Sequence, residues 1–78
     1  MIKTFYFKDK TYCNSYIVRE VIIKVNSINL VMTLCNDFKW QMFLYKNEKY
    51  VHKYDVTDKI VNKLIKEAKE YQQFLYES

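Results

Sequence analysis

The chain has 78 residues, is 50% hydrophobic and 18% aromatic, and contains neither glycine nor proline. This composition argues against disorder, and the lack of glycine excludes Gly-rich phosphate loops and nucleophile elbows. The net charge of +4 comes from lysines and a single arginine, Arg19, which disfavours bidentate reading of DNA bases. No apolar run is long enough to predict a membrane span or an export signal, so we expect an intracellular, cytoplasmic protein.

The first two thirds of the chain predict β-strands. Residues 3–8 alternate with Phe5 and Phe7 on one side, and Asp9-Lys10 fits a short connection. Residues 20–25 predict a second strand. Residues 11–18 fit an extension of that strand, a separate strand or a helical turn, because their periodicity does not discriminate.

Three asparagine-led breaks divide the following residues into strands. Asparagine tolerates left-handed backbone better than most residues and is the available turn former in a chain without glycine. The breaks are Asn26-Ser27, Asn36-Asp37 and Asn47-Glu48. The strands between and after them are predicted at residues 28–34, 39–46 and 49–54.

After Asp55 the hydrophobic period changes to that of a helix, predicted at about 56–76. Asp55 or Thr57 fits the N-cap, and with Thr57 as the cap Val56 and Val61 would form a hydrophobic staple. The helical residues predicted to pack on the sheet are Ile60, Leu64, Ile65 and Ala68. Their predicted contacts are Val21, Ile23, Leu30 and Met32.

These elements predict one α+β domain over residues 1–78, with the sheet at about 2–54. The expected architecture is a four- to five-stranded antiparallel meander with one long C-terminal helix packed on one face. The other face has no second helix to cover it. That exposed face is the expected location of function.

The chain offers few groups for catalysis or metal binding. Its one histidine is His52, its cysteines are Cys13 and Cys35, and its serines are Ser15, Ser27 and Ser78. A Cys–His nucleophile is conceivable, but no third orienting residue is indicated, and close ligand pairs of the kind that hold zinc are missing. We therefore expect no enzymatic activity, no metal and no cofactor, with free thiols favoured over a disulfide.

Residues 39–54 interleave lysines with aromatic residues more densely than any other segment. The candidate partner-binding residues are Tyr45, Lys46, Lys49, Tyr50, His52, Lys53 and Tyr54. If Trp40, Met42 and Val51 point inward, the outer face would be lined by Tyr45, Tyr50, His52 and Tyr54. Tyrosine is enriched in protein interfaces, so a small protein-binding module is the favoured interpretation.

In size and composition the chain resembles short accessory proteins of phages and mobile elements, many of which bind and inhibit a host enzyme or defence complex. The resemblance implies an inhibitor that acts on a host protein in the host cytoplasm. Stacking of bases on tyrosine beside lysine supports an alternative, a single-stranded nucleic-acid-binding accessory protein. A further alternative is a structural homodimer formed through an edge strand or the tyrosine-bearing face.

Overall fold

The computed structural model describes residues 3–13 and 16–77 of the chain. Five strands are followed by one helix: β1 (Phe5–Thr11), β2 (Ile17–Val25), β3 (Ile28–Cys35), β4 (Trp40–Lys46), β5 (Lys49–Val56) and α1 (Asp58–Glu77). Ile2, where the sheet was predicted to begin, and the candidate serines Ser15 and Ser78 lie outside the described residues.

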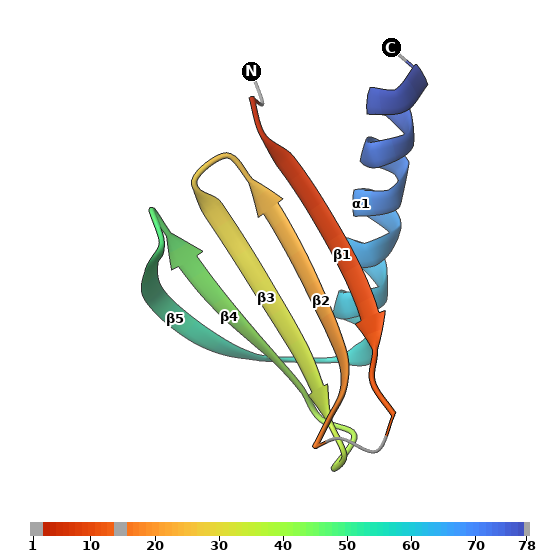
Figure 1. The fold of residues 1–78 in the computed structure, drawn as a ribbon. Coiled ribbons are helices and arrows are strands. Elements are labelled where there is room, and N and C mark those ends of the chain that lie inside the picture. The colour runs from red at the N-terminus through yellow and green to blue at the C-terminus, as the bar shows by residue number, and fades with distance from the viewer. Residues whose placement is uncertain (1–2, 14–15, 78) are drawn as a thin grey trace.

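The strands form one antiparallel sheet in the order β1-β2-β3-β4-β5, and α1 packs on one face of it (Figure 1). The predicted α+β meander is therefore confirmed. β1 is longer than predicted, because Asp9 and Lys10 pair with Val21 and Glu20 of β2 and do not form a connection. Val56 pairs with Trp40 as the last strand residue, so the helix begins two residues later than expected.

The hairpin turns explain how a chain without glycine reverses direction. Asn47 and Glu48 have φ values of 52° and 66°, the left-handed values of a two-residue type I′ turn between Lys46 and Lys49. Asn26 has φ 54° in the β2–β3 turn. Its Oδ1 also accepts hydrogen bonds from the backbone N–H groups of Lys3 and Thr4, at 2.8 and 3.1 Å. Asn26 thus makes the turn and secures the beginning of β1.

The core lies between α1 and the sheet. Its buried side chains are Val21, Ile23, Met32 and Trp40 from the sheet and Val61, Ile65 and Ala68 from the helix. The prediction that Ile60 packs on the sheet is wrong, since Ile60 is 46% exposed and its neighbour Val61 is fully buried. Leu64 and Leu30 are half-buried at the margin of this core.

Thr57 is the N-cap of α1. Its Oγ1 accepts a hydrogen bond from the backbone N–H of Ile60 at 3.4 Å, and its carbonyl accepts one from Val61 at 3.1 Å. Val56, immediately before the cap, packs against the cluster that contains Val61. Val56 and Val61 therefore lie where a hydrophobic staple requires them.

The single arginine, Arg19, lies on the helix side of the sheet, where it connects β1, β2 and the core. The Arg19 guanidinium donates two hydrogen bonds to the Asp9 carboxylate, at 2.9 and 2.6 Å, and lies 5.8 Å from the Trp40 ring centroid. The hydrogen bonds from Arg19 lower the pKa of Asp9, and the same bonds raise the pKa of Arg19. This planar, bidentate geometry is specific to arginine and gives Arg19 a role in linking β1, β2 and the core.

Within residues 3–13 and 16–77, no helix combines the length and the apolar character that a bilayer span requires.

Candidate functional site

The candidate site is the face of the sheet that points away from α1, here called the open face. Directly opposed residues of neighbouring strands share a face, so the strand register defines its members in three rows. The central row is Lys8, Ile22, Val31, Phe43 and Lys53. Toward the β2–β3 and β4–β5 turns lies the row Tyr6, Lys24, Asn29, Tyr45 and Tyr50. Toward the other end lies the row Lys10, Glu20, Thr33, Gln41 and Asp55.

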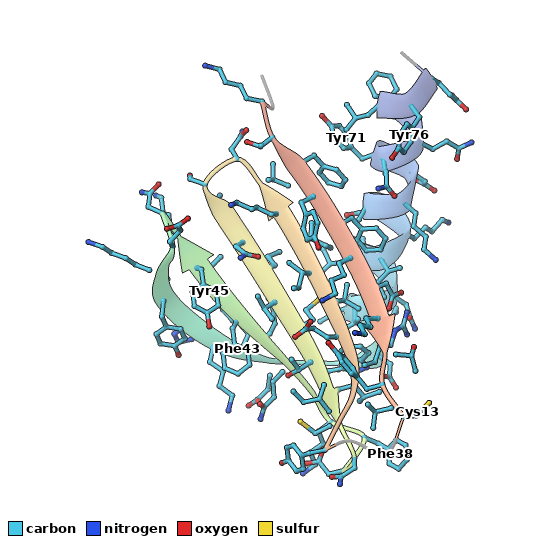
Figure 2. The ribbon with its side chains drawn as sticks, in the orientation of Figure 1. Cys13, Phe38, Phe43, Tyr45, Tyr71 and Tyr76 are labelled. Atoms are coloured by element: carbon cyan, nitrogen blue, oxygen red, sulfur yellow. The ribbon has the colours of Figure 1, made fainter. Side chains whose placement is uncertain are left out.

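The centre of the open face is apolar. Ile22, Val31 and Phe43 adjoin one another across three strands, and each is only half-buried. Beside them the rings of Tyr45 and Tyr50 meet edge to face with centroids 6.0 Å apart. Figure 2 shows Tyr45 and Phe43 along β4. Tyr50 is 59% exposed. A contiguous apolar and aromatic patch on a solvent-facing sheet is typical of an interaction surface.

Lysines flank this apolar centre. The three rows contain four lysines and two carboxylates, and one of the four, Lys8, forms an ion pair with Glu20 at 3.3 Å. The hydrogen bond with Glu20 raises the pKa of Lys8. Lys24 and Lys53 lie on opposite sides of the aromatic patch. The open face is therefore net positive, with cationic side chains around an apolar middle.

A polar hollow of about 270 Å³ lies at the end of the open face that carries the β2–β3 and β4–β5 turns. Its lining residues are Lys24, Asn26, Ser27, Asn29, Asn47 and Glu48. The Oδ1 atom of Asn29 is buried and accepts no hydrogen bond among the described residues. An unpaired buried acceptor costs about 1–3 kcal/mol, and a donor from a bound molecule would remove that cost.

The sequence-predicted site residues do not share one face. Tyr45, Tyr50 and Lys53 belong to the open face, whereas His52 and Tyr54 oppose Leu44 and Met42 and so lie on the helix side. The prediction that His52 and Tyr54 line the outer face is therefore wrong. These two rings contact each other instead, with centroids 4.6 Å apart.

A β-bulge in β5 causes this division. Leu44 pairs with His52, but the next residue, Tyr45, pairs with Tyr50, so Val51 is an extra residue in the bulge. Val51 is 51% exposed and does not point into the core as expected. The bulge reverses which face each later residue of β5 occupies.

Lys46 and Lys49 lie at the tip of the same hairpin. They oppose each other, and Lys46 also opposes Ile28, which places both on the helix side at the end of the sheet. Both are exposed. They border the open face at the turn but do not belong to its rows.

Sequence reasoning missed the contribution of the first three strands. The open face is completed by Tyr6, Lys24, Ile22 and Val31. The alternation of residues along β2 could have indicated this, because its even-numbered residues Ile22 and Lys24 lie on this face. The concentration of aromatic residues in residues 39–54 predicted a site on one hairpin alone. The candidate surface therefore extends across all five strands of the sheet.

The structure does not bring Cys35 and His52 together. His52 lies in the row of Leu44 and Leu30, and Cys35 is five residues farther along β3, about 16 Å at the rise of a strand. Cys13 and Cys35 are both free. Among residues 3–13 and 16–77, no group of three or more histidine, cysteine, aspartate or glutamate side chains is placed to hold a metal ion.

Comparison of the chain with protein-family models, with curated proteins and with solved structures found no match.

Proposed function

We propose that this protein is a non-enzymatic binding module that docks its open face on the acidic surface of a partner protein. The observation that carries the proposal is the apolar row Ile22, Val31 and Phe43, which lies on a sheet face that no element of the described chain covers. An antiparallel sheet with one solvated face usually alternates apolar inward and polar outward. An apolar row on the outward side departs from that pattern.

The chemistry of the open face favours an acidic partner with apolar side chains. The edge-to-face pair of Tyr45 and Tyr50 supplies large, rigid contact area next to the apolar row. Lys24 and Lys53 on either side would steer and orient an acidic surface. The buried, unpaired Oδ1 of Asn29 is an acceptor for a donor from the same partner.

The module would act as an inhibitor, by occupying a functional surface of its partner. Its small size and lysine- and tyrosine-rich composition support a role like that of phage accessory proteins that block a host enzyme or an anti-phage defence complex. On this proposal the partner is a host protein and the site of action is the host cytoplasm.

The experiment is a pull-down from lysate of a candidate host, with and without nuclease, using the wild-type protein, Tyr50→Ala and Tyr54→Ala. Tyr50 and Tyr54 lie on one strand but on opposite faces of the sheet, so Tyr54→Ala is the matched control. We expect a nuclease-resistant partner that Tyr54→Ala retains and Tyr50→Ala loses, chiefly through faster dissociation. Equal capture by the two variants would contradict the use of the open face.

A second candidate function is binding of single-stranded nucleic acid. The observation that favours it is that Lys24 and Lys53 share the open face with Tyr45, Lys24 in the same row two strands away and Lys53 on the neighbouring strand β5, since bases stack on tyrosine where lysines contact phosphates. In that case the affinity for an oligonucleotide would fall with log salt at a slope of about −0.7 per phosphate contact. A protein interface centred on Tyr45 and Tyr50 would depend on salt much less.

A further inference from the structure

The sheet has two edge strands, β1 and β5, and they differ in what lies beside them. α1 runs alongside β1 (Figure 1), and its Tyr71 ring contacts the Phe5 ring of β1 with centroids 4.9 Å apart. β5 pairs with β4 on one side, and no strand of the described part of the chain lies on its other side. Every residue of β5 except Val56 is exposed. β5 is therefore the edge whose free backbone groups are open to pairing with another strand.

The register of the sheet shows which backbone groups of β5 point outward. Hydrogen bonding alternates along an antiparallel pair, so every second residue of a strand bonds to the same neighbour. The Asn47 N–H donates to the Ser27 carbonyl at 2.9 Å, which means that odd-numbered residues of β4 bond to β3 and even-numbered ones to β5. The β5 residues opposite those even-numbered residues are His52, Tyr54 and Val56. The backbone N–H and C=O groups of Lys53 and Asp55 therefore point away from β4.

The side chains of Lys53 and Asp55 place opposite charges on one face of this edge. Both belong to the open face, both are exposed, and neither takes part in an ion pair recorded within residues 3–13 and 16–77. Tyr54, between them, lies on the helix side, is 41% exposed and has its ring centroid 4.6 Å from that of His52. An antiparallel copy of the same segment would match this charge pattern.

Pairing of β5 with a second β5 has one register that suits these charges. Outward-facing residues must oppose each other to exchange hydrogen bonds, so the register changes in steps of two residues. With Tyr54 on the two-fold axis, each Lys53 opposes Asp55 of the other copy. A shift of two residues in either direction places Lys53 opposite Lys53 or Asp55 opposite Asp55. Like charges directly opposite each other destabilise a strand pair, so the register centred on Tyr54 is favoured.

We propose that two copies of this chain pair antiparallel through residues 52–56 of β5, with the two-fold axis at Tyr54. Each Lys53 makes both N–H···O=C hydrogen bonds with Asp55 of the other copy, and their side chains form an ion pair on the open face. On the helix side the two Tyr54 rings meet at the axis, each beside its own His52 ring. Every contact is reciprocal, as two-fold symmetry requires.

Two features of β5 restrict its pairing to such a partner. The bulge at Val51 interrupts the regular strand immediately before the paired segment. A lysine on an edge strand discourages pairing with an arbitrary strand, but here Asp55 of the second copy neutralises Lys53. Because the paired segment is short and buries little area, we expect a weak and reversible dimer.

The pairing joins the two sheets into one and leaves the other surfaces of each copy free. The two-fold axis is perpendicular to the sheet, so both helices lie on one side and both open faces on the other. Each α1 leaves the end of β5 and runs alongside β1, the strand farthest from the joint (Figure 1). In a continuous sheet of both copies the two β1 strands lie roughly 40 Å apart, which keeps the helices separate. The dimer therefore presents two open faces side by side and does not require the proposed partner.

The test is sedimentation velocity of the purified protein from low micromolar to near-millimolar concentration. We expect a reversible transition from the 9.6 kDa chain to twice that mass. Lys53→Glu alone and Asp55→Lys alone each place like charges opposite each other and should raise the dimer dissociation constant about tenfold. An equimolar mixture of these two variants should dimerise with a constant within about threefold of the wild-type value, because every cross-strand pair between them is again of opposite charge.

A covalent readout tests the position of the axis. Directly opposed residues that do not exchange hydrogen bonds have Cα atoms about 4.5 Å apart, within the range that a disulfide spans. In a Cys13→Ser, Cys35→Ser background, Tyr54→Cys should therefore give a disulfide-linked dimer on mild oxidation. Lys49→Cys, at the hairpin tip and outside the paired segment, is the matched control and should give little.

Thermal unfolding of each charge variant is the control for folding, because residues 53 and 55 are exposed and their substitution should leave the fold intact. A protein that stays monomeric over the whole concentration range would overturn the proposal. So would a mixture of Lys53→Glu and Asp55→Lys that remains monomeric. A dimer that is insensitive to both charge changes but lost in Tyr50→Ala would place self-association on the open face instead and would also overturn it.

Discussion

The two faces of the sheet are formed by alternate residues of the same strands, but they differ in how far their apolar side chains are buried. On the helix side Val21 and Met32 are fully buried beneath α1. One residue along each strand, Ile22 and Val31 are just as apolar, yet they lie half-buried on the open face with no element of the described chain above them. The first face accounts for folding. The second retains apolar surface that folding does not use, which is why we assign binding to it.

The largest expected effect tests whether the two faces differ in stability. Met32→Ala should lower the free energy of unfolding by about 2–5 kcal/mol, because it opens a cavity in a closed core. Val31→Ala, at the adjacent position on the open face, should cost less than about 1 kcal/mol. Urea titration of the two variants measures the difference. Equal destabilisation would show that the open face is part of the core.

A smaller change in the free energy of unfolding, of opposite sign, tests whether binding uses the open face. Asn29→Val removes the buried, unpaired Oδ1 and should raise the free energy of unfolding by about 1 kcal/mol. The same variant should bind the partner more weakly, since it loses the acceptor at the base of the polar hollow. Chemical denaturation and binding kinetics together test this opposition. A variant that is more stable and binds unchanged would remove Asn29 from the site.

The ion pair on the helix side predicts a pH dependence. Asp9 has a pKa below its ordinary value of 3.8 in the folded state because Arg19 donates hydrogen bonds to it. A lowered folded-state pKa adds stability at pH values above 3.8 that is lost as the pH falls below 3.8 toward the folded-state value. Asp9→Asn should lower stability at pH 7 by up to about 1 kcal/mol and flatten the acid limb of the stability curve. Stability curves of the two proteins that stay parallel down to strong acid would contradict this.

The smallest expected effect concerns the β3–β4 turn, which lies at the end of the sheet opposite the β2–β3 and β4–β5 turns. Phe38 has φ 61° and is 78% exposed, an unusual conformation for an aromatic residue that costs about 1 kcal/mol or more (Figure 2). Phe38→Asn, with a residue that tolerates this region, should raise the melting temperature slightly. If Phe38 lies outside the binding surface, partner affinity should not change. Loss of affinity in this variant would extend the site beyond the open face.

The meander and the helix could be predicted because the hydrophobic residues follow a two-residue period and then a 3.6-residue period, with asparagine in the turns after β2, β3 and β4. The face of the sheet that each residue of β5 occupies could not be predicted. Tyr50, His52 and Tyr54 alternate as if on one face, and only pairing with β4 shows that Val51 is extra. Ile60 and Val61 both fit a helical stripe, and the position of α1 on the sheet decides which is buried. Local pattern determines elements, whereas orientation depends on tertiary packing.

Lysine footprinting of the protein bound to its captured partner tests the central claim most directly. The chain carries lysines on the open face, at the hairpin tip and on the exposed side of α1, so acetylation followed by mass spectrometry reports on each surface separately. Binding through the open face predicts that Lys24 and Lys53 become protected while Lys59 and Lys66 of α1 react as in the free protein. Protection confined to the lysines of α1, with Lys24 and Lys53 unchanged, would contradict it.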